Sequence, residues 1–186
     1  ALLVSTVSGL TAVGSGSLDS NTTGLRNCSL GFNSLGSNTT TDDSTAVGFN
    51  ALALATASAN TAFGSEALKS CTTGSGNTAV GPNSLGGLTI GLNNTVVGPS
   101  GASLTTGSDN VFIGVAVAQN SLTTSGSVYI GSNAGGNALS AGNNCVGVGV
   151  NSLFNNTSVE IVAIGVSALE TNTTGLRNTA VGHRAL

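Results

Sequence analysis

The sequence predicts an all-β protein, a parallel β-solenoid of about eleven coils of 16–18 residues each. Three observations lead to this prediction. A glycine recurs at a nearly constant spacing, a large apolar residue stands directly before each of these glycines, and charged residues are confined to a few positions of the repeat. A period near 17 residues is too short for a helix pair, which needs more than about 30 residues. It suits one coil of stacked β-strands.

The recurring glycine, which we call the anchor glycine, follows the previous one after 16, 17 or 18 residues. Glycine adopts backbone conformations closed to other residues, so we expect it to end a strand where the chain turns tightly. We interpret residues 1–186 as a single repetitive domain and expect it to be a fragment of a longer fibre. The anchor glycines are Gly14, Gly31, Gly48, Gly64, Gly81, Gly98, Gly114, Gly131, Gly149, Gly165 and Gly182.

The three residues before each anchor glycine form the expected strand. The residue three before it is β-branched in ten copies and the middle residue is usually Ala. The residue directly before it is always large and apolar, as at Val13, Val47, Val80 and Val181. Such residues favour strands, and successive side chains of a strand point to opposite sides. Neither side carries a charge, so we expect one to face the inside of the coil and the other to pack against sister chains.

A leucine stands four residues after the anchor glycine in eight copies, among them Leu18, Leu52, Leu85 and Leu186. We expect each coil to contain two short strands and two turns. In three consecutive copies the middle strand residue is larger and the leucine is replaced by a smaller residue, which pairs Val96 with Ala102, Phe112 with Ala118 and Tyr129 with Gly135. Packed interiors conserve volume. These two positions are therefore predicted to share one compartment.

All eleven charged residues fall at four positions of the repeat, five or six residues before the anchor glycine and two or five after it. Burying an unpaired charge is costly, so these positions are expected to meet water. The net charge is −3 and no basic stripe occurs, which argues against nucleic acid or an anionic membrane surface as a partner. No apolar run approaches the ~20 residues of a membrane span, so we expect no membrane insertion.

No group of residues predicts an active site, a cofactor site or a metal site, and we predict that the chain is not an enzyme. A zinc site needs clustered ligands, but His183 is the only histidine and Cys28, Cys71 and Cys145 show no Cys-x-x-Cys spacing. The four Asp do not recur in the frame of calcium-binding β-rolls. We expect the cysteines to be small, half-buried residues, with an intermolecular disulfide as the alternative.

Threonine stands eight residues before the anchor glycine in nine copies, often beside a second threonine. Some ice-binding solenoids display such ladders, so ice or surface binding is the alternative function. Those surfaces use Thr-x-Thr, whereas adjacent residues such as Thr22 and Thr23 would point to opposite sides of a strand. Seven Asn-x-Ser/Thr sequons also occur, which matter only where the source glycosylates Asn; they begin at Asn21, Asn27, Asn38, Asn93, Asn155, Asn156 and Asn172.

The motif Thr-Ala-Val-Gly-x-x-Ala-Leu followed by Thr-Thr-Gly-x-x-Asn resembles the head repeats of trimeric autotransporter adhesins. It is still more similar to the Asn-Thr-Ala-Val-Gly repeats of phage and large-virus fibre proteins. Residues 172–186 carry the clearest copy, and residues 21–27 repeat its first seven residues. The resemblance implies a homotrimer of left-handed β-rolls, located outside the cell on a virion or cell surface. It would serve as a structural or adhesive fibre with a host-cell receptor or glycan as partner; phage fibre and cell-surface adhesin both remain open.

Overall fold

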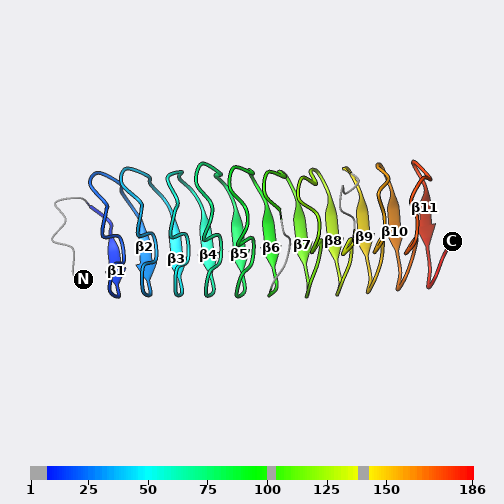
Figure 1. Cartoon of the computed structure of the whole chain (residues 1–186), viewed down its shortest axis with the longest axis horizontal. Coiled ribbons are helices and arrows are strands. Elements are labelled where there is room, and N and C mark those ends of the chain that lie inside the picture. The colour runs from blue at the N-terminus through cyan, green and yellow to red at the C-terminus, as the bar shows by residue number, and fades with distance from the viewer. Residues whose placement is uncertain (1–7, 100–103, 138–142) are drawn as a thin grey trace.

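The computed structural model describes residues 8–99, 104–137 and 143–186. These residues contain eleven strands of three residues each and no helix. The strands form one parallel sheet in chain order, and the ten windings between them make a rod with β1 near one end and β11 at the other (Figure 1). They are β1 Thr11–Val13, β2 Cys28–Leu30, β3 Thr45–Val47, β4 Thr61–Phe63, β5 Thr78–Val80, β6 Thr95–Val97, β7 Val111–Ile113, β8 Val128–Ile130, β9 Val146–Val148, β10 Val162–Ile164 and β11 Thr179–Val181.

Every strand pairs with its neighbours in the register of the repeat. Ala62, for example, lies between Ala46 and Ala79. The pairing continues past the strand, because the N–H of Gly64 donates to the carbonyl of Val47, which precedes the previous anchor glycine. Equivalent residues of successive coils therefore stack into columns at the spacing of paired strands, about 4.8 Å. The predicted parallel solenoid, with its anchor glycines in one column, is confirmed.

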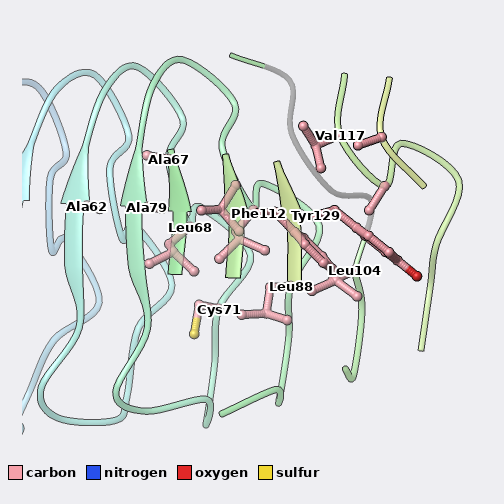
Figure 2. Close-up of a cluster of buried hydrophobic side chains, with 14 of the residues drawn as sticks. Ala62, Ala67, Leu68, Cys71, Ala79, Leu88, Leu104, Phe112, Val117 and Tyr129 are labelled. Atoms are coloured by element: carbon pink, nitrogen blue, oxygen red, sulfur yellow. The ribbon is translucent and has the colours of Figure 1, made fainter. Parts of the chain in front are cut away.

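The interior of the solenoid is formed by the middle strand residues and the leucines that follow the anchor glycines. Ala62 and Ala79 lie on neighbouring strands with their side chains buried in the same cluster as Leu68 (Figure 2). Leu18, Leu52 and Leu85 are also fully buried; Leu186, the last residue, is 88% exposed. One side of each strand thus faces the inside of the coil, as predicted.

The predicted exchange of volume between these two columns is confirmed where the structure describes it. The rings of Phe112 and Tyr129 stack at a centroid distance of 5.2 Å inside the solenoid (Figure 2). Ala118 is fully buried in the same cluster as Phe112. A Cβ atom added to Gly135 would lie 2.6 Å from Cε2 of Tyr129, so Gly135 leaves the space that this ring fills. Ala102 lies outside the described residues.

The second strand expected in each coil is absent from the described residues, so that prediction is wrong. All eight leucines of the leucine column have φ between 47° and 55°. The residue two after the anchor glycine is also left-handed, as at Asn33 and Asn83. A backbone that enters the left-handed region at every second residue cannot extend into a strand. This side of the coil is built from turns, which bond to the next coil through contacts such as the Leu52 N–H to the Ala67 carbonyl, 3.0 Å.

The charged side chains lie on the outside, as predicted, and none of them is buried. Two pairs join neighbouring coils at the position five before the anchor glycine. Arg26 donates to both carboxylate oxygens of Asp43, at 2.5 and 2.9 Å, and this hydrogen bonding lowers the pKa of Asp43. Arg177 donates to Glu160 at 2.5 Å. Because these pairs are exposed, water screens them and they add little to stability.

Candidate functional site

The most extended surface feature is the outer side of the sheet, which we call the outer face. It consists of the first and third residues of all eleven strands. The third residue is more than a third exposed in seven strands, at Val13, Leu30, Phe63, Val97, Ile113, Ile164 and Val181. The other third-position residues, including Val47 and Val80, are half-buried. None of the first- or third-position residues is charged. The chain itself therefore leaves one side of its sheet uncovered, as the sequence predicts.

Apolar residues directly after the anchor glycine widen the outer face. Phe32 and Phe49 stack with a centroid distance of 5.6 Å while remaining 54% and 49% exposed. Val115, Val150 and Val166 occupy the same position in later coils and are also exposed. With the seven strand residues, these five side chains expose on the order of 1,000 Å², above the few hundred Å² of apolar patch usual on a monomeric protein. One partner in a standard interface buries a similar area, about 800 Å².

An asparagine ladder runs through the interior just before the strands. Asn60, Asn77, Asn94 and Asn110 are fully buried, and each of the last three donates from Nδ2 to Oδ1 of the one before, at 2.9–3.2 Å. Each Oδ1 also accepts the backbone N–H of the residue at the same position in the next coil. Buried polar groups are costly unless paired, so the ladder specifies the register in which the coils stack.

The prediction from sequence did not include this ladder, although a signal for it was present. Asn stands four residues before the anchor glycine in six of the eleven copies, at Asn27, Asn60, Asn77, Asn94, Asn110 and Asn178. If this position were on the surface and tolerated many residue types, the same amide side chain would not be expected to recur there in six copies. The repeated amide therefore indicated a column of mutual hydrogen bonds.

Replacing Asn77 tests the ladder. Asn77→Ala removes the acceptor of two Asn94 donors and the donor to the Gly91 carbonyl. Buried groups left without partners should lower the free energy of unfolding by about 2 kcal/mol. Asn77→Ser is the matched control, because Ser44 and Ser127 occupy this position in other coils and their hydroxyls accept the next backbone N–H. Urea unfolding followed by circular dichroism should show a smaller loss for Ser than for Ala; equal losses would contradict the role of the ladder.

The threonines form columns at a turn of the coil. Six hydroxyls donate to the carbonyl of the equivalent residue one coil further on, at 2.7–3.2 Å, those of Thr22, Thr56, Thr72, Thr89, Thr105 and Thr157. Thr56 and Thr157 lie eight residues before their anchor glycines, as Thr23 does. They nevertheless stack in the column of Thr22, because their coils are one residue shorter. These hydroxyls are thus engaged within the protein.

The cysteines and the histidine do not come together. Cys71 and Cys145 are buried in different coils and Cys28 lies half-buried on the outer face. Burial raises the pKa of the Cys71 thiol to about 11, so it stays protonated and unreactive near neutral pH. His183 is exposed beside the last anchor glycine. Among the residues that the structure describes, no three His, Cys, Asp or Glu side chains are grouped so that they could hold a metal ion.

Comparison with known proteins adds no assignment. No protein-family model matches the chain, and neither a curated protein nor a solved structure matches it. The fold and its surfaces define the class to which it can be assigned, a parallel β-solenoid repeat protein. Over its described residues the chain has no helix that is long and apolar enough to cross a membrane.

Proposed function

We propose that this chain is a segment of a structural or adhesive fibre, in which three copies pack side by side through their outer faces. The observation that carries the proposal is the uncharged, apolar outer face, which follows the sheet from β1 to β11. Sister chains are suited to cover it because identical columns repeat at an identical spacing on each copy. The resemblance to fibre repeats supports the same assembly of left-handed β-rolls, placed outside the cell on a virion or cell surface.

The mechanism of such a fibre is geometric. Each coil is tied to the next by backbone bonds around the winding, and the asparagine ladder adds side-chain bonds between the coils of β4 to β7, which favours a stiff rod. The polar turns then present the same small contact surface many times along the rod. Many weak contacts on one rigid support add up to avidity for a host-cell receptor or glycan without any one strong site. This function requires neither a cofactor nor a catalytic group.

The mass of the purified chain in solution tests the proposal. We expect light scattering after size exclusion to give three times the chain mass. A double variant, Val97→Lys with Ile113→Lys, should give the monomer mass, because it places charges on exposed positions that the trimer would bury. The circular dichroism spectrum should be unchanged, since both side chains point away from the interior.

A matched control makes the same chemical change elsewhere. Leu122 and Leu176 are 45% and 58% exposed and belong neither to the strands nor to the positions that widen the outer face. Leu122→Lys with Leu176→Lys should therefore leave the assembly intact. A wild-type monomer, or a double variant on the outer face that still assembles, would contradict the proposal.

Ice or surface binding through the threonines is the alternative function. The hydroxyls of the Thr22 column donate to carbonyls of the next coil. They therefore support ice binding less than the apolar outer face supports the fibre. A thermal hysteresis assay on the purified chain distinguishes the two functions.

A further inference from the structure

The seven sequons differ in how their asparagines are held. Three of them, Asn27, Asn38 and Asn156, are at most 1% exposed. The amide nitrogen of Asn27 donates to the Thr41 carbonyl at 2.6 Å, and its oxygen accepts the Ser44 N–H at 2.9 Å. These side chains belong to the interior of the solenoid and tie one coil to the next.

Three further sequons hold bonds between coils; Asn21 is buried, with 8% of it exposed, and Asn155 and Asn172 are half-buried. The oxygen of Asn21 accepts from the Asn38 amide at 3.2 Å. Asn172 donates to Asn156 at 2.9 Å, and the oxygen of Asn155 accepts from Asn137, also at 2.9 Å. A large substituent on Asn21 or Asn172 would have to displace bonds that keep neighbouring coils in register.

Asn93 is different, and we propose that it is the acceptor of an N-linked oligosaccharide on this chain. It begins the sequon Asn93-Asn94-Thr95 and lies exposed in the turn before β6. Its amide nitrogen donates at 3.1 Å to the carboxylate of Asp109, an exposed bond that water can replace. Its backbone is left-handed, with φ 55°, a conformation that Asn tolerates well. A glycan here needs no change in the interior.

The modification would be ordinary glycosyl transfer in a secretory pathway. The sugar donor is a lipid-linked diphosphate oligosaccharide. A bond forms between the Asn93 amide nitrogen and C1 of the first sugar, the bond from C1 to the phosphate oxygen breaks, and the amide gives up one proton. Transfer takes place on the chain before it folds. A chain modified at Asn27, Asn38 or Asn156 cannot bury that amide, so folded molecules are selected for the modification at Asn93.

Expression of the whole chain with a secretion signal in a eukaryotic host tests this inference, which does not rest on the proposed fibre function. Peptide mass mapping of the folded, secreted protein should find Asn93 occupied in most molecules and Asn27, Asn38 and Asn156 unoccupied. An unmodified Asn93, or any sequon more fully occupied than Asn93, would overturn the proposal. Retention of the wild-type chain in the cell with glycans on the three buried sequons would overturn it as well.

Two matched substitutions control the experiment. Thr95→Val destroys the Asn93 sequon while keeping the fold, because Val takes this place in the next four strands; it should remove the glycan mass. Asn93→Gln should do the same by a different change. Thr40→Ala destroys the sequon of buried Asn38 and should leave the mass of the glycan on the secreted protein unchanged.

Discussion

Gly131→Ala is expected to be among the most destabilising single substitutions in this chain. Gly131 has φ 132°, which L-residues rarely adopt, and a Cβ atom there would lie 2.6 Å from both the carbonyl carbon and the oxygen of Gly149 in the next coil. Backbone strain costs about 1–3 kcal/mol, and overpacking adds about 1–3 kcal/mol. We therefore expect a loss of about 3 kcal/mol or more in the free energy of unfolding, measured in urea by circular dichroism.

Two control variants separate strain from close approach. Gly182 has nearly the same φ, 128°, but an added Cβ would meet nothing within 4 Å, so Gly182→Ala should show the cost of strain alone. Gly87 lies outside the anchor column, and a Cβ there would meet only the Leu104 carbonyl oxygen, at 3.6 Å. Gly87→Ala should be nearly neutral. If Gly131→Ala unfolded at the same urea concentration as Gly87→Ala, the close stacking of the anchor glycines would be refuted.

Tyr129→Ala is expected to lose about 3–5 kcal/mol, the usual cost of removing a buried aromatic ring from a core. Tyr129 is 1% exposed, and its ring fills the space left by Gly135 and by Gly147 in the following coil. It is also the only tyrosine, and the chain has no tryptophan. Tyrosine fluorescence of the wild-type protein therefore reports directly on this layer of the solenoid during unfolding.

The double variant Tyr129→Ala with Gly135→Leu should recover much of this loss. It recreates the pairing of Ala79 with Leu85, and Gly135 already has the left-handed φ, 62°, that the leucines of this column adopt. Gly135→Leu alone should be destabilising by about 1–3 kcal/mol, because the ring and the leucine compete for one space. Losses that simply add in the double variant would mean that the two positions do not share a compartment.

The sequence determined which residues are equivalent and how they stack. Anchor glycines at a near-constant spacing, preceded by an apolar residue such as Val47 or Val80, indicated the strands and their register. Confinement of charge indicated the outside, since a charge is costly to bury. The exchange of volume between Tyr129 and Gly135 indicated that the middle strand position and the leucine column share one compartment. The glycine and the apolar residue before it recur in every copy, and the charged residues keep to the same few positions, so the repetition itself made these features visible.

The sequence could not determine the path of the chain between the strands. Leu52 and Leu85 are apolar in either a strand or a turn, and no rule of composition predicts that they adopt a left-handed backbone. That conformation is held by bonds to the coils on each side, which exist only once the coils have stacked. The register of the shorter coils was decided in the same way, because Thr56 joins the column of Thr22 through hydrogen bonds and not through its distance from the glycine.

The sequence by itself thus fixed a parallel, columnar β-solenoid with charges outside. Only the tertiary structure decided which apolar side stays uncovered, which amides lie in the buried ladder and that Asn93 lies exposed at the surface. The physical reason is that a repeat pattern indicates which side chains occupy equivalent positions in different coils. Whether a given side chain meets water, its own copy in the next coil or the interior depends on contacts between successive coils, whose equivalent residues lie 16–18 residues apart in the chain.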